Sequence, residues 1–229
     1  MTSSTMERYI TPAQAREIDR RAVSECGMSG LVLMENAARG ALDVLLRLGV
    51  KGPIAICCGW GNNGGDGLAM ARLLDAEGYE VRVALWALNS ELSPDASTNL
   101  GILRHCNVRL ELCAPADLLE LHPALLQGAD WVVDALFGTG FRGAFRPPYG
   151  AVVRQLNQAT ARRLAIDVPS GLDANTGHAA ENSFRADHTV TFVAPKIGFQ
   201  NPVAAPYLGQ VHVAQIGAPR RLIDDVLRD

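Results

Sequence analysis

Several segments that would identify common protein classes are missing from this chain of 229 residues. No run of about 18 apolar residues occurs, so we expect no helix that spans a membrane. The first residues, 1–9, are polar and contain no apolar signal core, so secretion is not expected. The net charge is −3 and basic residues form no run, which argues against a broad surface for nucleic acid. These absences predict a globular protein with neither a membrane nor a nucleic acid as its partner.

Motifs of common enzyme chemistries are missing as well. The chain has no C-x-x-C pair, no G-x-S-x-G nucleophile turn and no G-x-x-x-x-G-K-[ST] phosphate loop, so zinc binding, serine hydrolysis and ATP hydrolysis are disfavoured. Five cysteines, an odd number, indicate reduced and packed thiols in a cytoplasmic protein. The five histidines show no spacing typical of metal ligands, and we expect them to be structural or exposed.

The chain does contain a regular alternation of strand-like and helix-like segments. Hydrophobic residues make up 48% and charged residues 20%, which suits a globular core. Helices are expected at 12–25, 31–48, 66–77, from 93–94 to about 106, at 116–127, 149–158 and 220–227. Strands are expected at 53–58, 81–86, 108–112, 131–134, 163–167, 189–193 and 211–214. This order predicts one α/β domain over residues 1–229, with two helices before a mostly parallel sheet that is covered on both faces.

A glycine-rich run, Gly59–Gly67, follows the first strand and precedes a helix. Residues 59–64 satisfy G-x-G-x-x-G, and a strand–turn–helix of this kind directs free backbone N–H groups at a ligand. The acidic residue that binds ribose in dehydrogenases is absent from the end of the second strand, where Glu91 is the first acid. Asn63 and Asp66 are not needed for a pyrophosphate. A nucleotide-like ligand is therefore favoured, and a tight turn that binds nothing is the alternative.

Two further strands end in aspartate-led loops. Asp134 opens a loop that runs to Gly143, and Asp167 opens the segment that leads to Ser170. Because ligands bind beyond the carboxyl ends of parallel strands, these carboxylates are expected to converge there, or else each caps its own turn. Asn63, Asp134 and Ser170 offer hard oxygen ligands, which suit Mg²⁺, Ca²⁺ or an alkali cation rather than zinc. One carboxylate among them favours an ion of low charge.

Two basic residues accompany these loops. Arg142, among the glycines of 138–143, suits phosphate binding, and a solvated loop charge is the equal alternative. Lys196 also follows a strand and could reach the same edge, although a surface lysine is the more ordinary interpretation.

Taken in order, these segments resemble the NAD(P)H-hydrate epimerase family from about Thr11 to Leu222. The matching segments are Gly61–Gly67, Asp134–Gly140, Asp167–Leu172 and Val190–Lys196, and Leu33–Ala38 is similar as well. The resemblance implies a Rossmann-like three-layer α/β/α sandwich, a homodimer and one potassium ion per subunit. It also implies a repair reaction on NADH or NADPH that carries a hydroxyl at C6 of the nicotinamide ring. The family interconverts the R and S epimers, so that an ATP- or ADP-dependent dehydratase that takes the S form can restore the cofactor.

The resemblance also assigns residues, position by position. Asn63, Asp134 and Ser170 match the family's potassium ligands. The segments that bind the hydrated nucleotide match Asn62, Asn63, Gly64, Gly65 and Asp66, then Gly138, Thr139, Gly140, Phe141, Arg142, Gly143 and Ala144, and also Asp167. Many bacterial members continue into a fused dehydratase, whereas this chain ends at Asp229. The dehydratase is therefore expected elsewhere, or the chain is a fragment.

The chemistry of the reaction selects one of these residues. Electron donation from the ring nitrogen can expel the C6 hydroxyl, and addition of water to the other face inverts the centre. This needs an acid/base and negative charge near the cation, and Asp167 is the candidate acid/base because a bound cation would hold Asp134 ionised. One alternative is a non-catalytic scaffold of the same fold that binds a nucleotide, RNA or a protein, but it would be expected to lose these residues. Another is a conventional NAD-dependent oxidoreductase, which lacks its ribose acid here.

Overall fold

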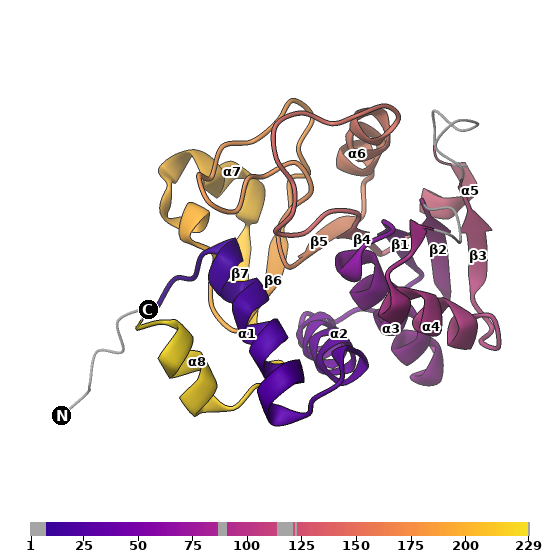
Figure 1. Cartoon of the computed structure of the whole chain (residues 1–229). Helices are drawn as coiled ribbons and strands as arrows, with labels where there is room; N and C mark the ends of the chain where they lie inside the picture. The colour runs from indigo at the N-terminus through magenta and orange to yellow at the C-terminus, as the bar shows by residue number, and fades with distance from the viewer. Residues whose placement is uncertain (1–7, 87–90, 114–120, 122, 229) are drawn as a thin grey trace.

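Figure 1 shows the computed structural model of the chain, in which residues 8–86, 91–113, 121 and 123–228 are described. The helices are α1 Pro12–Cys26, α2 Gly30–Arg47, α3 Asn62–Ala76, α4 Pro94–Leu103, α5 Pro123–Leu126, α6 Tyr149–Gln158, α7 Ala205–Leu208 and α8 Arg220–Val226. The strands are β1 Ile54–Cys58, β2 Val81–Leu85, β3 Arg109–Leu112, β4 Trp131–Ala135, β5 Arg162–Ile166, β6 His188–Phe192 and β7 Gln210–Ala214. Two 3₁₀ turns, Ile197–Gln200 and Pro202–Ala204, precede α7. Most of the helix expected at 116–127 lies outside the described residues.

The strands form a seven-stranded sheet in the order β3-β2-β1-β4-β5-β6-β7, and each pair of neighbouring strands is parallel. The first three strands extend the sheet from β1 toward one edge, which β3 forms. The chain then crosses to the other side of β1, where β4 to β7 extend the sheet toward the opposite edge. The order therefore reverses between β1 and β4. In a parallel sheet, the crevice outside the carboxyl ends at such a reversal is where ligands bind.

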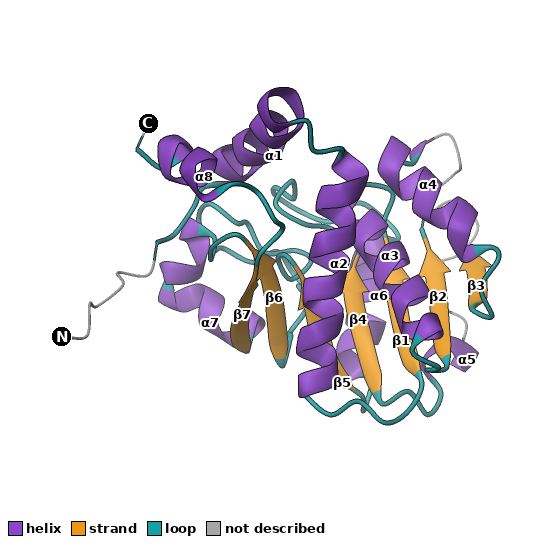
Figure 2. Cartoon of the chain, turned by 90° about the horizontal axis from the view of Figure 1, so that it is seen from below, coloured by secondary structure: helices purple, strands orange, loops and turns teal. Residues whose placement is uncertain are grey.

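Helices cover both faces of this sheet, as the alternation predicted. On one face α2, α3 and α4 pack on side chains such as Ile54 and Ile56, and on the other α6 packs on Ala55 and Cys57 (Figure 2). Because successive strand residues point to opposite faces, a strand that is buried on both sides is apolar throughout. β1 shows this, since all five of its residues are buried.

The two N-terminal helices occupy different places. α2 covers the sheet, whereas α1 lies beyond the carboxyl ends of the strands beside α8 (Figure 2). Ile18 and Ala22 of α1 pack with Leu222 and Val226 of α8 in a small core of their own. α1 begins at Thr11, whose side chain accepts a hydrogen bond from the backbone of Gln14 in a capping box. The first helix is thereby fixed over the edge of the sheet where ligands are expected.

The helix after the glycine run begins earlier than the sequence indicated. We expected it to begin at Asp66, and it begins at Asn62, so most of the run is its first turns. The glycines are required by packing: a Cβ on Gly64 would lie 1.9 Å from the carbonyl oxygen of Gly59, and one on Gly67 would lie 2.6 Å from the Cβ of Ala135. Glycine usually disfavours a helix interior, but here it allows α3 to approach the sheet more closely than any side chain permits.

The cysteines fit the expectation of reduced thiols only in part. All five are free, and Cys57, Cys58 and Cys113 are buried, but Cys26 at the end of α1 is exposed rather than packed. Within the described ranges, no helix combines the length and the apolar character needed to cross a bilayer.

Candidate active site

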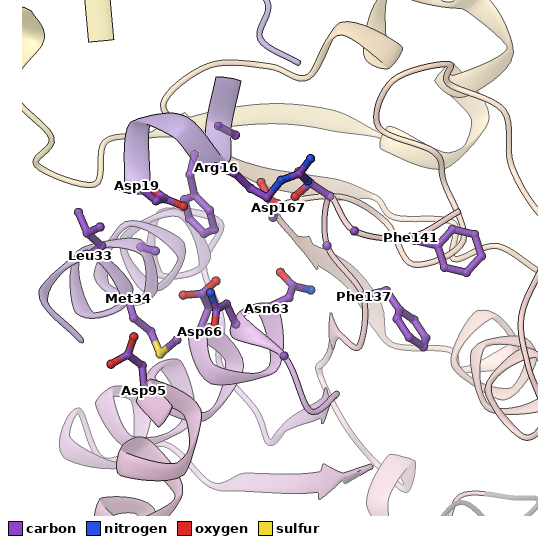
Figure 3. A pocket seen from close by; sticks show the side chains of 18 of the residues that line it. Arg16, Asp19, Leu33, Met34, Asn63, Asp66, Asp95, Phe137, Phe141 and Asp167 are labelled. Carbon is purple, nitrogen blue, oxygen red and sulfur yellow. The ribbon is translucent and has the colours of Figure 1, made fainter. Parts of the chain in front are cut away.

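A cavity of about 970 Å³ opens at the carboxyl edge of the sheet, beside the reversal between β1 and β4. Its size is at the upper end of the range typical of small-molecule sites. Its walls are α1 and α2, the start of α3, the loop from Leu136 to Tyr149, the turn after β5 and the segment that follows β6 (Figure 3). Residues from segments far apart in the sequence therefore meet around one space.

The start of α3 contributes polar side chains to this cavity. Asn62, Asn63 and Asp66 line the cavity. Gly64 and Gly65 do not, because they pack against the protein interior. The helix has Gly61 as its N-cap, and no side chain caps its first turn. Its first backbone N–H groups lack intrahelical partners, so this end of α3 suits an anionic or amide ligand group.

Asn63 has an amide group without a partner. Both its Oδ1 and its Nδ2 are buried, and neither makes a hydrogen bond with the described part of the chain. Asn63 lies against Gly138, where an added Cβ would be 3.3 Å from its Cβ and Cγ. A buried amide without partners costs free energy unless a ligand or ion satisfies it, which makes Asn63 a candidate binding residue.

Beneath the next loop, Asp134 and Ser170 form a compact pair. The Ser170 hydroxyl donates to Asp134 Oδ1 at 2.7 Å, and its backbone N–H donates to Oδ2 at 2.7 Å. The backbone N–H of Leu136 donates to the same carboxyl at 3.1 Å, and that of Phe137 donates to the Ser170 hydroxyl at 3.0 Å. Burial raises the pKa of Asp134 to about 6 despite these hydrogen bonds. The pair lies behind the cavity wall and holds the loop that includes Gly138.

Asp167 lies just after β5 and is paired with a buried cation. Lys196 Nζ is 2.8 Å from Asp167 Oδ1, and the two side chains are 2% and 15% exposed. Lys196 also donates to the hydroxyl of Thr191 at 2.7 Å, and that hydroxyl donates to Asp167 Oδ1 at 3.3 Å. The interpretation of Lys196 as a surface residue was therefore wrong, because the turn after β6 brings it back to the end of the neighbouring strand.

The backbone at this pair is strained. Asp167 has φ 65°, and Val193, in the segment that leads to Lys196, has φ 69°. Residues other than glycine rarely adopt this left-handed backbone conformation, and a β-branched residue such as valine adopts it at a cost of roughly 1–3 kcal/mol. Both residues line the cavity. Such strain concentrates at functional sites, and here it directs Asp167 and Lys196 toward each other.

Two more carboxyl groups face the same end of the cavity. Asp66 of α3 is 9% exposed, and burial and then Asp167 and Asp19 raise its pKa well above the usual value. Asp19 of α1 lies at the cavity mouth and reaches solvent. Partial desolvation of its carboxyl, and then the charge of Asp167, raise its pKa to about 6. Figure 3 shows Asp19, Asp66 and Asp167 directed at one space. Sequence reasoning missed Asp19, because nothing in an amphipathic helix marks one aspartate as facing a site.

The loop after β4 forms the opposite wall. Most of the expected residues of this loop line the cavity, and Gly143 does not. Those that do are Gly138, Thr139, Gly140, Phe141, Arg142 and Ala144. Arg142 donates to the backbone oxygens of Thr139 and Phe141 and lies 3.5 Å from Asp173, so the loop already uses much of its hydrogen-bonding capacity.

Aromatic side chains gather on this wall. Phe137 contacts Tyr149 at 4.9 Å between ring centroids and Trp60 at 5.4 Å, and Phe141 contacts Phe145 at 4.9 Å. Sequence reasoning did not identify this surface, because its members come from two loops and a helix. It offers apolar, flat contacts suited to ring-shaped ligand groups.

Comparison with known proteins gives consistent matches. The family profile described as YjeF-related protein N-terminus matches residues 30–198. A protein named NAD(P)H-hydrate epimerase from Rhodopirellula baltica is 41% identical over 93% of this chain and 86% of its own length. One with the same name from Pirellula staleyi is 37% identical over 96% and 97%. A bifunctional NAD(P)H-hydrate repair enzyme from Moorella thermoacetica is 40% identical over 93% of this chain but 41% of its own length.

A solved structure shares the fold. The crystal structure of the yeast protein Ynu0 is similar with a TM-score of 0.79, covering 96% of this chain and 93% of the yeast chain at 24% identity. The α/β architecture described above is thus shared with a protein whose sequence has diverged widely.

Proposed function

The chain belongs to the NAD(P)H-hydrate epimerase family, and we propose that it interconverts the R and S forms of hydrated NADH and NADPH at C6 of the nicotinamide ring. The observation that carries this proposal is the Asp167–Lys196 pair, 2.8 Å apart and facing a cavity at the carboxyl edge of the sheet. The cavity, the polar start of α3 and the aromatic wall around Phe137 support a nucleotide with flat rings as the ligand.

The proposed chemistry uses the ring nitrogen of the substrate. Its lone pair expels the C6 hydroxyl as water and leaves an iminium cation, and water then adds to the other face. Asp167 is an acid/base that exchanges protons with water at C6. Its carboxylate also provides negative charge beside the cation, and Lys196 fixes its position. The family resemblance supports Asp167 in this role, and its ion pair with the buried Lys196 supports a fixed position for its carboxyl group.

The proposal includes one potassium ion per subunit, held by oxygens of Asn63, Asp134 and Ser170. The unpartnered amide of Asn63 fits an ion ligand, and all three groups offer hard oxygens. Only one of the three proposed ligands is a carboxylate, which suits an ion of low charge better than a divalent one. The ion would hold the β4 loop and Asn63 in place and keep Asp134 ionised.

The proposal also includes a functional partner and an assembly state. Relatives such as the bifunctional repair enzyme from Moorella thermoacetica support pairing with an ATP- or ADP-dependent dehydratase that consumes the S epimer. We further propose a homodimer, which light scattering of the purified protein tests.

A coupled assay tests the proposed function. A mixture of both hydrate epimers is first exhausted by a dehydratase specific for the S form, and the protein is then added while reduced-nicotinamide absorbance is followed. A renewed rise to completion supports epimerase activity, and stimulation by potassium over sodium supports the ion site. No acceleration over spontaneous epimerisation by folded protein would favour a non-catalytic binding module instead.

The same assay tests the role of Asp167. Asp167→Asn is expected to abolish epimerisation while the protein still binds the nucleotide, measured by equilibrium titration. Full residual activity would remove Asp167 from the mechanism.

A further inference from the structure

Asp66 is a buried acid without a partner in the cavity wall. Its side chain comes from the second turn of α3, and the residue is 9% exposed. Within the described residues, none donates a hydrogen bond to its carboxyl, and no Lys or Arg is in ion-pair contact with it. Figure 3 shows this carboxyl directed into the same space as Asp167 and Asp19. Because Asp66 lines the cavity and no described residue satisfies its carboxyl, this group is available to a ligand.

The charges around Asp66 favour its protonated form. The charged groups that act on Asp66 are the carboxyls of Asp167 and Asp19, and the ammonium of Lys196 is paired with Asp167. Burial and then the two like charges raise the pKa of Asp66 well above its usual value, which favours its protonated form. Asp167 differs because the ammonium of Lys196 lies 2.8 Å from its Oδ1. Two carboxyl groups with different surroundings in one site are the arrangement in which acid and base roles can be divided.

Resting on the proposed epimerisation, we infer that Asp66 is a second acid/base group that serves the face of the nicotinamide ring opposite to Asp167. The iminium intermediate is planar, so inversion requires water to leave from one face and to arrive on the other. One carboxyl cannot serve both faces unless the ring turns over within the site. Asp66 and Asp167 come from different walls, α3 and the turn after β5, and both line the same cavity. We place the nicotinamide ring between them, so that each carboxyl serves one face.

The proton balance of this step closes. For the epimer whose hydroxyl faces Asp66, the carboxylic acid gives its proton to that hydroxyl, and the C6–O bond breaks with its electron pair leaving as water. A second water then adds from the side of Asp167, the new C6–O bond forms, and Asp167 accepts the proton that this water loses. The two carboxyls have then exchanged protonation states. The reverse conversion, or proton exchange with solvent, restores the starting state.

Oxygen exchange in ¹⁸O-labelled water distinguishes this role from a binding role. Each pure epimer is incubated with wild type, Asp66→Asn and Asp75→Asn, and both epimerisation and ¹⁸O incorporation at C6 are measured above the uncatalysed rate. Asp75 is the matched control, because it lies at the far end of the same helix and outside the cavity lining. Circular dichroism and nucleotide titration establish that each variant is folded and binds.

In Asp66→Asn we expect epimerisation to fall at least about 100-fold, the lower range for loss of an acid/base group. One epimer should still exchange its hydroxyl oxygen with retention, because Asp167, in its protonated form, can give its proton to a hydroxyl on its own face and take a proton back when water returns. Asp75→Asn should match wild type. Epimerisation by Asp66→Asn within a few-fold of wild type would overturn the inference. The inference would also be overturned if Asp66→Asn is folded and binds nucleotide but exchanges the C6 oxygen of neither epimer. An inactive wild type would instead refute the proposed function.

Discussion

Replacing Lys196 with methionine tests how the Asp167 site is held. Methionine keeps a long apolar side chain but removes the ammonium, which lies 2.8 Å from Asp167 Oδ1 and donates to Thr191 Oγ1 at 2.7 Å and to the carbonyl of Phe192 at 3.2 Å. The variant leaves a carboxylate that is only 15% exposed without its cation. Removing one partner of a buried ion pair costs about 3–5 kcal/mol.

We expect a loss of about 3 kcal/mol, at the low end of that range, because Asp167 borders the cavity and can recruit water. The measurement is urea unfolding at pH 7, with the slope compared to detect altered denatured states. The double variant Asp167→Asn with Lys196→Met removes the uncompensated charge, and should recover about 1–2 kcal/mol, within the coupling expected of contacting residues. If Lys196→Met unfolds within about 1 kcal/mol of wild type, the ion pair does not hold this site in the manner argued here.

Two further predictions concern the glycine run and the cavity acids. Gly64→Ala should destabilise the protein by about 3 kcal/mol or more, since its Cβ would meet the backbone oxygen of Gly59 at 1.9 Å. Gly101→Ala in α4, where no atom lies within 4 Å of the new Cβ, should instead stabilise it by about 0.5–1 kcal/mol in the same thermal or urea unfolding series. For Asp19, burial and the Asp167 carboxylate raise its pKa from 3.8 to about 6. Ionisation of Asp19 therefore costs folding free energy that builds up as the pH rises from 3.8 to about 6, and below pH 3.8 there is no such cost. Asp19→Asn should therefore gain stability relative to wild type as the pH rises through this window, by less than about 1 kcal/mol because the carboxyl reaches solvent, and a difference that is constant with pH would contradict this.

The sequence predicted the larger elements well where one local rule acted alone. The predicted helix at 149–158 matches α6, and Thr11 with Pro12 marks the start of α1 because a cap and a first-turn proline need only neighbouring residues. The prediction failed at α3, whose start was placed four residues late at Asp66 rather than Asn62. Glycine ordinarily indicates a turn, and only contact with Gly59 and the sheet explains why a helix contains it.

The candidate site divides in a similar way. Asp134 lies near the carboxyl end of β4, and Asp167 and Ser170 follow β5, so the rule for parallel sheets predicted their side of the molecule from sequence. The hydrogen bonds between Asp134 and Ser170 bring two of them together. Lys196 was misjudged because its burial depends on the path of the chain after β6. Asp19 was missed because its exposure to the cavity depends on where α1 lies over the sheet.

By itself, the sequence determined the alternation of strands and helices, the glycine run after β1 and the family resemblance, because periodicity, capping and motif order are properties of neighbouring residues. Only the tertiary structure decided which distant groups meet. It paired Lys196 with Asp167, left the amide of Asn63 without a partner, and placed His188 on β6 with its Nδ1 3.1 Å from Nε2 of His212 on β7. These outcomes depend on strand order and chain path, and burial then fixes the charges that the site presents to its ligand.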